Sequence, residues 1–74
     1  MYFVVNITLA NGLYAKECFD FPTIVAARAN HHYFLTSSYS NSSLEYFMSV
    51  ILDVDGNVID REVYHAPVPV AEEE

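Results

Sequence analysis

The chain has 74 residues, of which 53% are hydrophobic and 15% aromatic, and ten acidic residues against three basic ones give a formal net charge of −7. This length predicts one small globular domain and excludes a second. The scarcity of Lys and Arg argues against direct nucleic-acid binding, because phosphate contacts need clustered cations. No run approaches the roughly 18 apolar residues of a membrane span, and the first residues lack the basic segment of a signal peptide. We therefore expect a cytoplasmic protein without a membrane partner.

The charge is unevenly distributed along the chain. Residues 1–43 contain as many acidic as basic side chains, whereas residues 44–74 contain eight acids and only one base, Arg61. The acidity therefore belongs to the second half of the protein.

The first segment, residues 2–21, predicts two strands around Asn11-Gly12, because β-branched and aromatic residues dominate and Asn-Gly is a strong hairpin signal. A two-residue loop would pair Leu9 with Tyr14. We favour a three-residue loop of residues 10–12, which pairs Leu9 with Leu13. That register gathers eight apolar side chains on one predicted core face: Phe3, Val5, Ile7, Leu9, Leu13, Ala15, Phe19 and Phe21.

A helix is predicted to begin after Asp20-Phe21-Pro22-Thr23, where an Asp or Thr oxygen is available as a cap. We expect about three turns, fraying near Tyr33, followed by a mobile polar connection over residues 36–43. At 100° per residue, one side collects Ile24, Ala27, His31 and Leu35, and another collects Val25, Ala29 and Tyr33. The second side predicts either contact with another chain or incidental apolar exposure.

Residues 44–53 and 58–65 predict a second strand pair around Asp55-Gly56. A two-residue turn there pairs Leu52 with Ile59, Val50 with Arg61 and Met48 with Val63. The predicted core face is Tyr46, Met48, Val50, Leu52, Ile59 and Val63. The expected fold class is α+β: a single ββαββ domain over residues 1–66, with one helix packed on a four-stranded, mostly antiparallel sheet. Residues 67–74 are expected to form an extended acidic tail.

The same register places carboxylates and large apolar groups together on the other face of the second hairpin. This face has three interpretations: an ordinary solvated surface, a docking surface for a basic partner, or a self-association surface. We favour docking, with aromatic groups as anchors and carboxylates for steering. The predicted partner-binding residues are Glu45, Phe47, Ile51, Asp53, Asp60, Glu62 and Tyr64.

Other constellations favour structural roles. The acidic segment from Asp53 to Asn57 invites comparison with a calcium-binding loop, which needs a glycine at position 6. Here Gly56 stands at position 4, which favours a tight turn. His31, His32 and His65 are candidate ligands for a metal ion. Because His31 and His32 are adjacent, however, their side chains on a helix point about 100° apart, which favours surface or helix-end positions. The only thiol, Cys18, has no sequence pattern that pairs it with a histidine, the base that would activate it as a nucleophile. We therefore expect no catalytic residues, no metal and no cofactor.

In size, acidity and element order, the chain resembles small acidic accessory proteins of bacteriophages of the anti-CRISPR and host-takeover type. The features that carry the resemblance are Asn11-Gly12, residues 22–30, Asp55-Gly56 and the acidic second hairpin. The resemblance implies stoichiometric inhibition of a host protein in the host cytoplasm. We accordingly expect a non-enzymatic module or inhibitor that binds the basic surface of a larger protein, for example a host protein that handles nucleic acid. The alternative is a homodimeric structural module with no inhibitory role.

Overall fold

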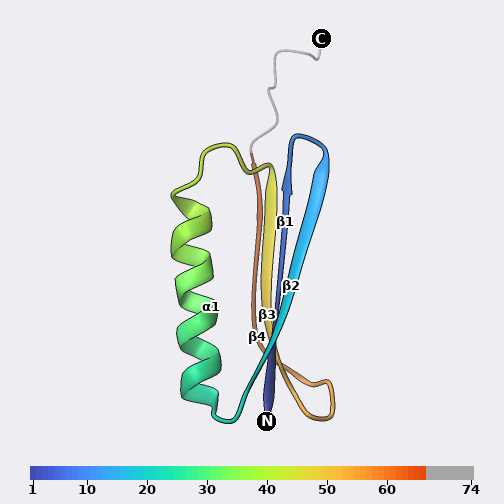
Figure 1. Cartoon of the computed structure of the whole chain (residues 1–74), viewed down its shortest axis with the longest axis vertical. Helices are drawn as coiled ribbons and strands as arrows, with labels where there is room; N and C mark the ends of the chain where they lie inside the picture. The colour runs from blue at the N-terminus through green and yellow to red at the C-terminus, as the bar shows by residue number, and fades with distance from the viewer. Residues whose placement is uncertain (67–74) are drawn as a thin grey trace.

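The computed structural model describes residues 1–66 and contains two hairpins joined by one helix (Figure 1). The elements are β1 (Tyr2–Ala10), β2 (Leu13–Phe21), α1 (Ile24–Tyr39), β3 (Tyr46–Asp53) and β4 (Val58–His65). All neighbouring strands are antiparallel, in the order β2-β1-β3-β4. The predicted ββαββ fold of the α+β class is confirmed. The predicted acidic tail, residues 67–74, lies outside the described residues.

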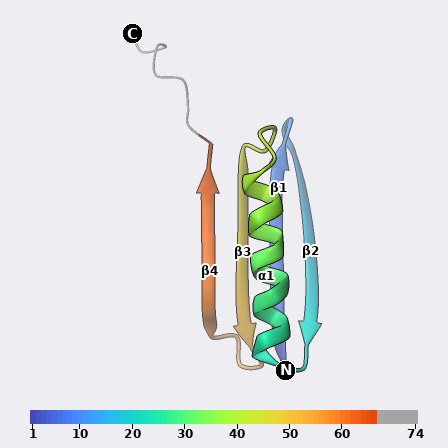
Figure 2. The same ribbon diagram turned by 90° about the vertical axis from the view of Figure 1, so that its left-hand side faces the viewer.

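The helix α1 covers one face of the sheet and runs lengthwise along the strands, in front of the two central ones, β1 and β3 (Figure 2). Its N-cap is Thr23, one of the two residue types predicted to supply the cap, and Thr23 Oγ1 accepts a hydrogen bond from the backbone N–H of Ala26 at 3.2 Å. Ala27 and His31 are buried against the sheet, whereas Val25 and Tyr33 are 75% and 74% exposed on the outer side of the helix. No helix among residues 1–66 is long and apolar enough to cross a membrane.

The helix continues beyond the predicted end near Tyr33, through residues predicted to form a polar connection. Tertiary contacts explain the difference. Ser38 is buried, and the Tyr39 ring packs edge-on against Phe47 with ring centroids 4.9 Å apart. These contacts outweigh the modest helix propensity of the Thr and Ser residues in the last turn.

The predicted register of the first hairpin is wrong. Ala10 pairs with Leu13 and Leu9 with Tyr14, so the loop contains only Asn11 and Gly12. Both have positive φ, 55° and 77°, as a type I′ turn requires, and Asn tolerates this region well enough that no third loop residue is needed. The shift separates the predicted core set: the apolar residues of β1 point to the face opposite that of the apolar residues of β2. These groups are Phe3, Val5, Ile7 and Leu9, and Leu13, Ala15, Phe19 and Phe21.

The second hairpin has the predicted pairs Met48 with Val63 and Val50 with Arg61. Near the turn, a register shift between Ile51 and Leu52 pairs Leu52 with Val58 rather than with the predicted Ile59. The larger correction concerns orientation. The face that α1 covers is the one predicted to point away from it, and the predicted core residues of this hairpin lie on the opposite face.

The core between α1 and the sheet is small and partly polar. Its apolar centre is Val4, Ala27 and Ile51, none of which has any exposed surface, and Tyr2, Phe21 and Ile24 pack around it. Phe47 is 1% exposed, and Asn6, His31, Ser38 and Ser49 are buried polar residues. Val50 is also buried, but it belongs to the face that α1 does not cover.

Candidate functional site

The predicted partner-binding residues lie on the face of the sheet beneath α1 or close to the hairpin turns, and the two aliphatic or aromatic residues at its centre are buried. These two, Phe47 and Ile51, cannot reach a partner at exposures of 1% and 0%. The Phe47 ring stacks on Tyr64 with centroids 4.9 Å apart and meets the edge of Phe34 at 6.2 Å. The predicted apolar anchors are therefore core residues of this fold.

Two of the predicted acidic residues bind turns of their own chain. Glu45 Oε2 accepts a hydrogen bond from the backbone N–H of Asn11 at 3.0 Å and thereby joins the two hairpins. Asp53 Oδ2 accepts from the Asn57 side-chain amide at 3.0 Å, and its Oδ1 accepts from the backbone N–H groups of Asp55 and Asn57, both at 2.9 Å. These bonds, first of all those from Asn57, lower the pKa of Asp53.

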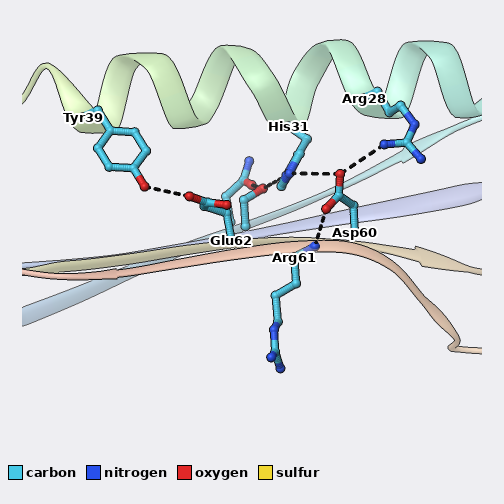
Figure 3. Close-up of polar contacts among 8 residues, drawn as sticks. Arg28, His31, Tyr39, Asp60, Arg61 and Glu62 are labelled. Atoms are coloured by element: carbon cyan, nitrogen blue, oxygen red, sulfur yellow. Dashed lines mark hydrogen bonds and ion pairs between the residues drawn. The ribbon is translucent and has the colours of Figure 1, made fainter.

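The other two acidic residues connect β4 to α1 (Figure 3). Asp60 Oδ2 lies 3.0 Å from Arg28 Nη1, and its Oδ1 accepts from the backbone N–H of Arg61 at 2.9 Å. Glu62 Oε2 accepts a hydrogen bond from the Tyr39 hydroxyl at 2.8 Å, which raises the pKa of Tyr39 because the bond favours the protonated hydroxyl. The acidic hairpin thus binds the helix, a contact that the sequence pattern had not indicated.

A buried polar network lies at the centre of the covered face. The Ser49 hydroxyl donates to Asn6 Oδ1 at 2.6 Å and lies 2.7 Å from His31 Nδ1. Because Ser49 has one hydrogen and Asn6 Oδ1 only accepts, His31 must donate to Ser49 from Nδ1. Neutral His31 therefore leaves Nε2 unprotonated. Burial is the main cause that lowers the pKa of His31, against the opposing effect of nearby Asp60.

Ser49, His31 and Asp60 are the residue types of a nucleophilic triad, but their geometry does not serve catalysis. A nucleophile must reach its substrate, and Ser49 has no exposed surface. Asp60 Oδ2 lies 3.9 Å from His31 Nε2, too far for the hydrogen bond that orients a catalytic base. The network instead satisfies polar groups in the core and specifies how α1 packs on the sheet.

His31, His32 and Asp60 have potential metal-ligand atoms within 4.8 Å of one another. The third histidine that the sequence offered, His65, is on β4 against Tyr46. However, Asp60 Oδ2, which lies 3.9 Å from His31 Nε2, is already 3.0 Å from the Arg28 guanidinium. A fixed positive charge at this place opposes a second cation, and we assign no metal site to it.

A shallow groove of about 300 Å³ lies between the end of α1 and β4. Its lining is mainly hydroxyl, amide and aromatic: Ser38, Tyr39, Asn41, Ser42, Leu44, Phe47, Tyr64 and Ala66. Among the residues with described positions, no carboxylate, histidine or thiol lines it, so it assembles no acid–base pair.

Within residues 1–66, no helix lies over the opposite face of the sheet (Figure 1), and we call it the uncovered face. The strand registers define it as four cross-strand rows: Tyr14, Leu9, Tyr46 and His65; Lys16, Ile7, Met48 and Val63; Cys18, Val5, Val50 and Arg61; and Asp20, Phe3, Leu52 and Val58. Most of its side chains are aliphatic or aromatic, and charges occur only on the edge strands β2 and β4. Sequence reasoning identified most of these apolar residues but placed them in the core.

Comparisons of the chain with models of protein families, with curated proteins and with solved structures find no match.

Proposed function

We propose that the chain is a non-enzymatic protein-binding module that acts by burying the uncovered face of its sheet against another protein surface. The observation that carries the proposal is the apolar centre of this face, formed by β1 and β3. Eight apolar side chains alternate there along the two strands: Phe3, Val5, Ile7, Leu9, Tyr46, Met48, Val50 and Leu52. A contiguous apolar surface of this kind is typical of interaction sites.

The distribution of polar groups on the uncovered face supports this function. Its charged residues, Lys16, Asp20 and Arg61, are all on the edge strands. An apolar centre with a polar rim is the usual anatomy of a protein–protein interface. The complementary surface is apolar at its centre and carries an acidic group opposite Lys16 or Arg61, rather than the basic centre that the sequence led us to expect.

The test is affinity capture with the full chain in cells of its natural source, using two matched double variants. Ile7→Thr with Met48→Thr removes apolar surface from the centre of the uncovered face but keeps β-branched strand formers. Val25→Thr with Tyr33→Thr makes a comparable change on the outer side of α1, where both side chains are about three-quarters exposed. Circular dichroism first verifies that both variants are folded.

The proposal predicts that the wild type and the α1 variant capture the same partner, which can be another copy of the chain. The uncovered-face variant is expected to capture at least tenfold less of this partner. Equal retention by the uncovered-face variant would overturn it. An enzymatic role would instead appear as turnover that Ser49→Ala abolishes in a folded variant.

A second candidate function is docking of the acidic α1 side on a basic surface of a larger protein, the inhibitor function that the phage-protein resemblance implies. It is favoured by the position of the acids: six of the seven in residues 1–66 lie on the α1 side or at turns. Glu17→Lys with Asp55→Lys, two exposed positions, tests it. Loss of capture in this variant at low salt, with retention by the uncovered-face variant, would favour this candidate over the first.

A further inference from the structure

We propose that the partner on the uncovered face is a second copy of this chain, in a two-fold dimer whose sheets pack face to face with β2 of one copy over β4 of the other. The inference rests on the proposed function of the uncovered face and specifies its occupant. It follows from the charge distribution, the size and the strand order of this face.

The charges of the chain are divided between the two sides of the sheet in a way that permits self-association. Of the seven acidic residues in residues 1–66, only Asp20 lies on the uncovered face, together with two of the three basic residues, Lys16 and Arg61. Figure 3 shows the Arg61 side chain on the side of the sheet opposite α1. A face-to-face dimer keeps the acidic sides of both copies outward, so six of these seven acidic residues lie away from the contact and their repulsion across it is weakened by salt screening.

The uncovered face is large enough for a stable dimer. Its strands are eight or nine residues long. At about 3.3 Å per residue and 4.8 Å between strands, four of them span about 27 by 19 Å, or about 500 Å² in projection. Two such faces reach about 1,000 Å², the lower bound for a biological interface, before the relief of the side chains is counted.

The position of Arg61 selects the direction of the two-fold axis. An axis that crosses the strands would place β4 over β4 and bring the Arg61 side chains of the two copies toward each other. An axis parallel to the strands places β4 over β2 of the partner, because the strand order is β2-β1-β3-β4. Arg61 then lies over β2 of the partner between Lys16 and Asp20, the single carboxylate that residues 1–66 place on this face, so it meets one like and one opposite charge instead of the second Arg61.

This geometry also brings one pair of residues together that is far apart within a single chain. Cys18 pairs with Val5, Val5 with Val50 and Val50 with Arg61, so Cys18 and Arg61 share one cross-strand row. Within one chain, three strand spacings of about 4.8 Å separate their backbones, which is beyond the reach of a disulfide. Across the proposed dimer, the same row places Arg61 of one copy over Cys18 of the other.

The experiment is thiol cross-linking of Arg61→Cys, with the native Cys18 present, by a short bis-maleimide, because packed sheets lie about 10 Å apart, too far for a direct disulfide. The cross-linker is expected to convert most of this variant to a covalent dimer on a denaturing gel. Two controls test the geometry. Arg61→Cys with Cys18→Ser is expected to remain monomeric on the gel, because the two engineered thiols lie at opposite edges of the dimer. Asp55→Cys, on the exposed β3–β4 turn, reports random collision when Cys18 is present.

Light scattering on the unmodified chain is expected to give twice the monomer mass of 8.4 kDa, and the Ile7→Thr with Met48→Thr variant is expected to give the monomer mass. A wild-type monomer at about 100 μM, or no more covalent dimer in Arg61→Cys than in Asp55→Cys, would overturn the dimer. Covalent dimer in the variant without Cys18 would overturn the axis. A third outcome separates the dimer from the proposed function. If the chain is a monomer and captures another protein that the uncovered-face variant does not capture, the dimer is contradicted and the proposed function is supported.

Discussion

The two faces of this sheet differ in a way that reverses the usual expectation. The face beneath α1 contains Asn6 and Ser49 at its centre, whereas the uncovered face is apolar along both central strands. The surface of the helix accounts for the choice, because its buried positions are the small or polar residues Ala27, His31 and Ser38. A helix side of this composition satisfies buried polar groups that an aliphatic face could not. The more apolar face is thereby left for another surface.

The largest test of this difference compares two neighbouring residues of β3. Phe47→Ala removes a ring buried among three aromatic neighbours and is expected to lower the free energy of unfolding by about 3–5 kcal/mol. Met48→Ala, on the uncovered face, is expected to cost much less in the monomer, with a loss that grows with protein concentration as the dimer forms. Urea unfolding at two protein concentrations measures both. Equal losses in the dilute monomer would contradict the assignment of the faces.

The buried network predicts the next largest effect. Ser49→Ala deprives Asn6 Oδ1 and the His31 Nδ1–H of their hydrogen-bond partner, and a buried unsatisfied group costs about 1–3 kcal/mol. Ser37→Ala, at an exposed position of α1, is the matched control and is expected to leave stability nearly unchanged. If thermal unfolding shows no difference between the two variants, the network is not a determinant of packing.

The pH dependence of stability tests whether His31 is buried in its neutral form. Burial lowers the pKa of His31 in the folded chain, so the unfolded chain takes up this proton more readily. Stability is therefore expected to fall as the pH drops below about 6.5, the ordinary histidine pKa, and to level off at the lower folded pKa. His31→Gln, whose side-chain amide can still donate to Ser49, should flatten this slope. His32→Gln, at an exposed position, should retain it; the reverse outcome would contradict the assignment.

The smallest effect is expected at the ion pair between α1 and β4. The side chains of Arg28 and Asp60 are 44% and 38% exposed, and pairs of this kind contribute about 1 kcal/mol or less. Arg28→Gln should therefore shift the melting temperature only slightly, and the shift should shrink further in high salt. A loss as large as that of Ser49→Ala would mean that the pair, rather than the polar network, holds the helix to the sheet.

Local signals in the sequence were sufficient for the element order and for much of the pairing. The Asn11-Gly12 turn, the Thr23 cap and the pairs of Met48 and Val50 across the second hairpin depend on neighbouring residues, and the structure agrees with them. The loop length at Asn11 was missed because both lengths suit Asn-Gly, and we chose between them by collecting apolar residues on one face. That criterion assumed that one face of the sheet would hold all of the core.

Strand alternation in the sequence determines which residues share a face, but it does not determine which face meets the helix. Residues of each face were grouped correctly within the second hairpin as far as the register shift after Ile51, yet the predicted binding surface with Phe47 and Ile51 lies beneath α1. Only the tertiary structure decided this, because the choice depends on matching buried donors and acceptors across the helix–sheet contact. Asn6, His31 and Ser49 lie on three separate elements, and their hydrogen bonds exist only when the helix packs on that side.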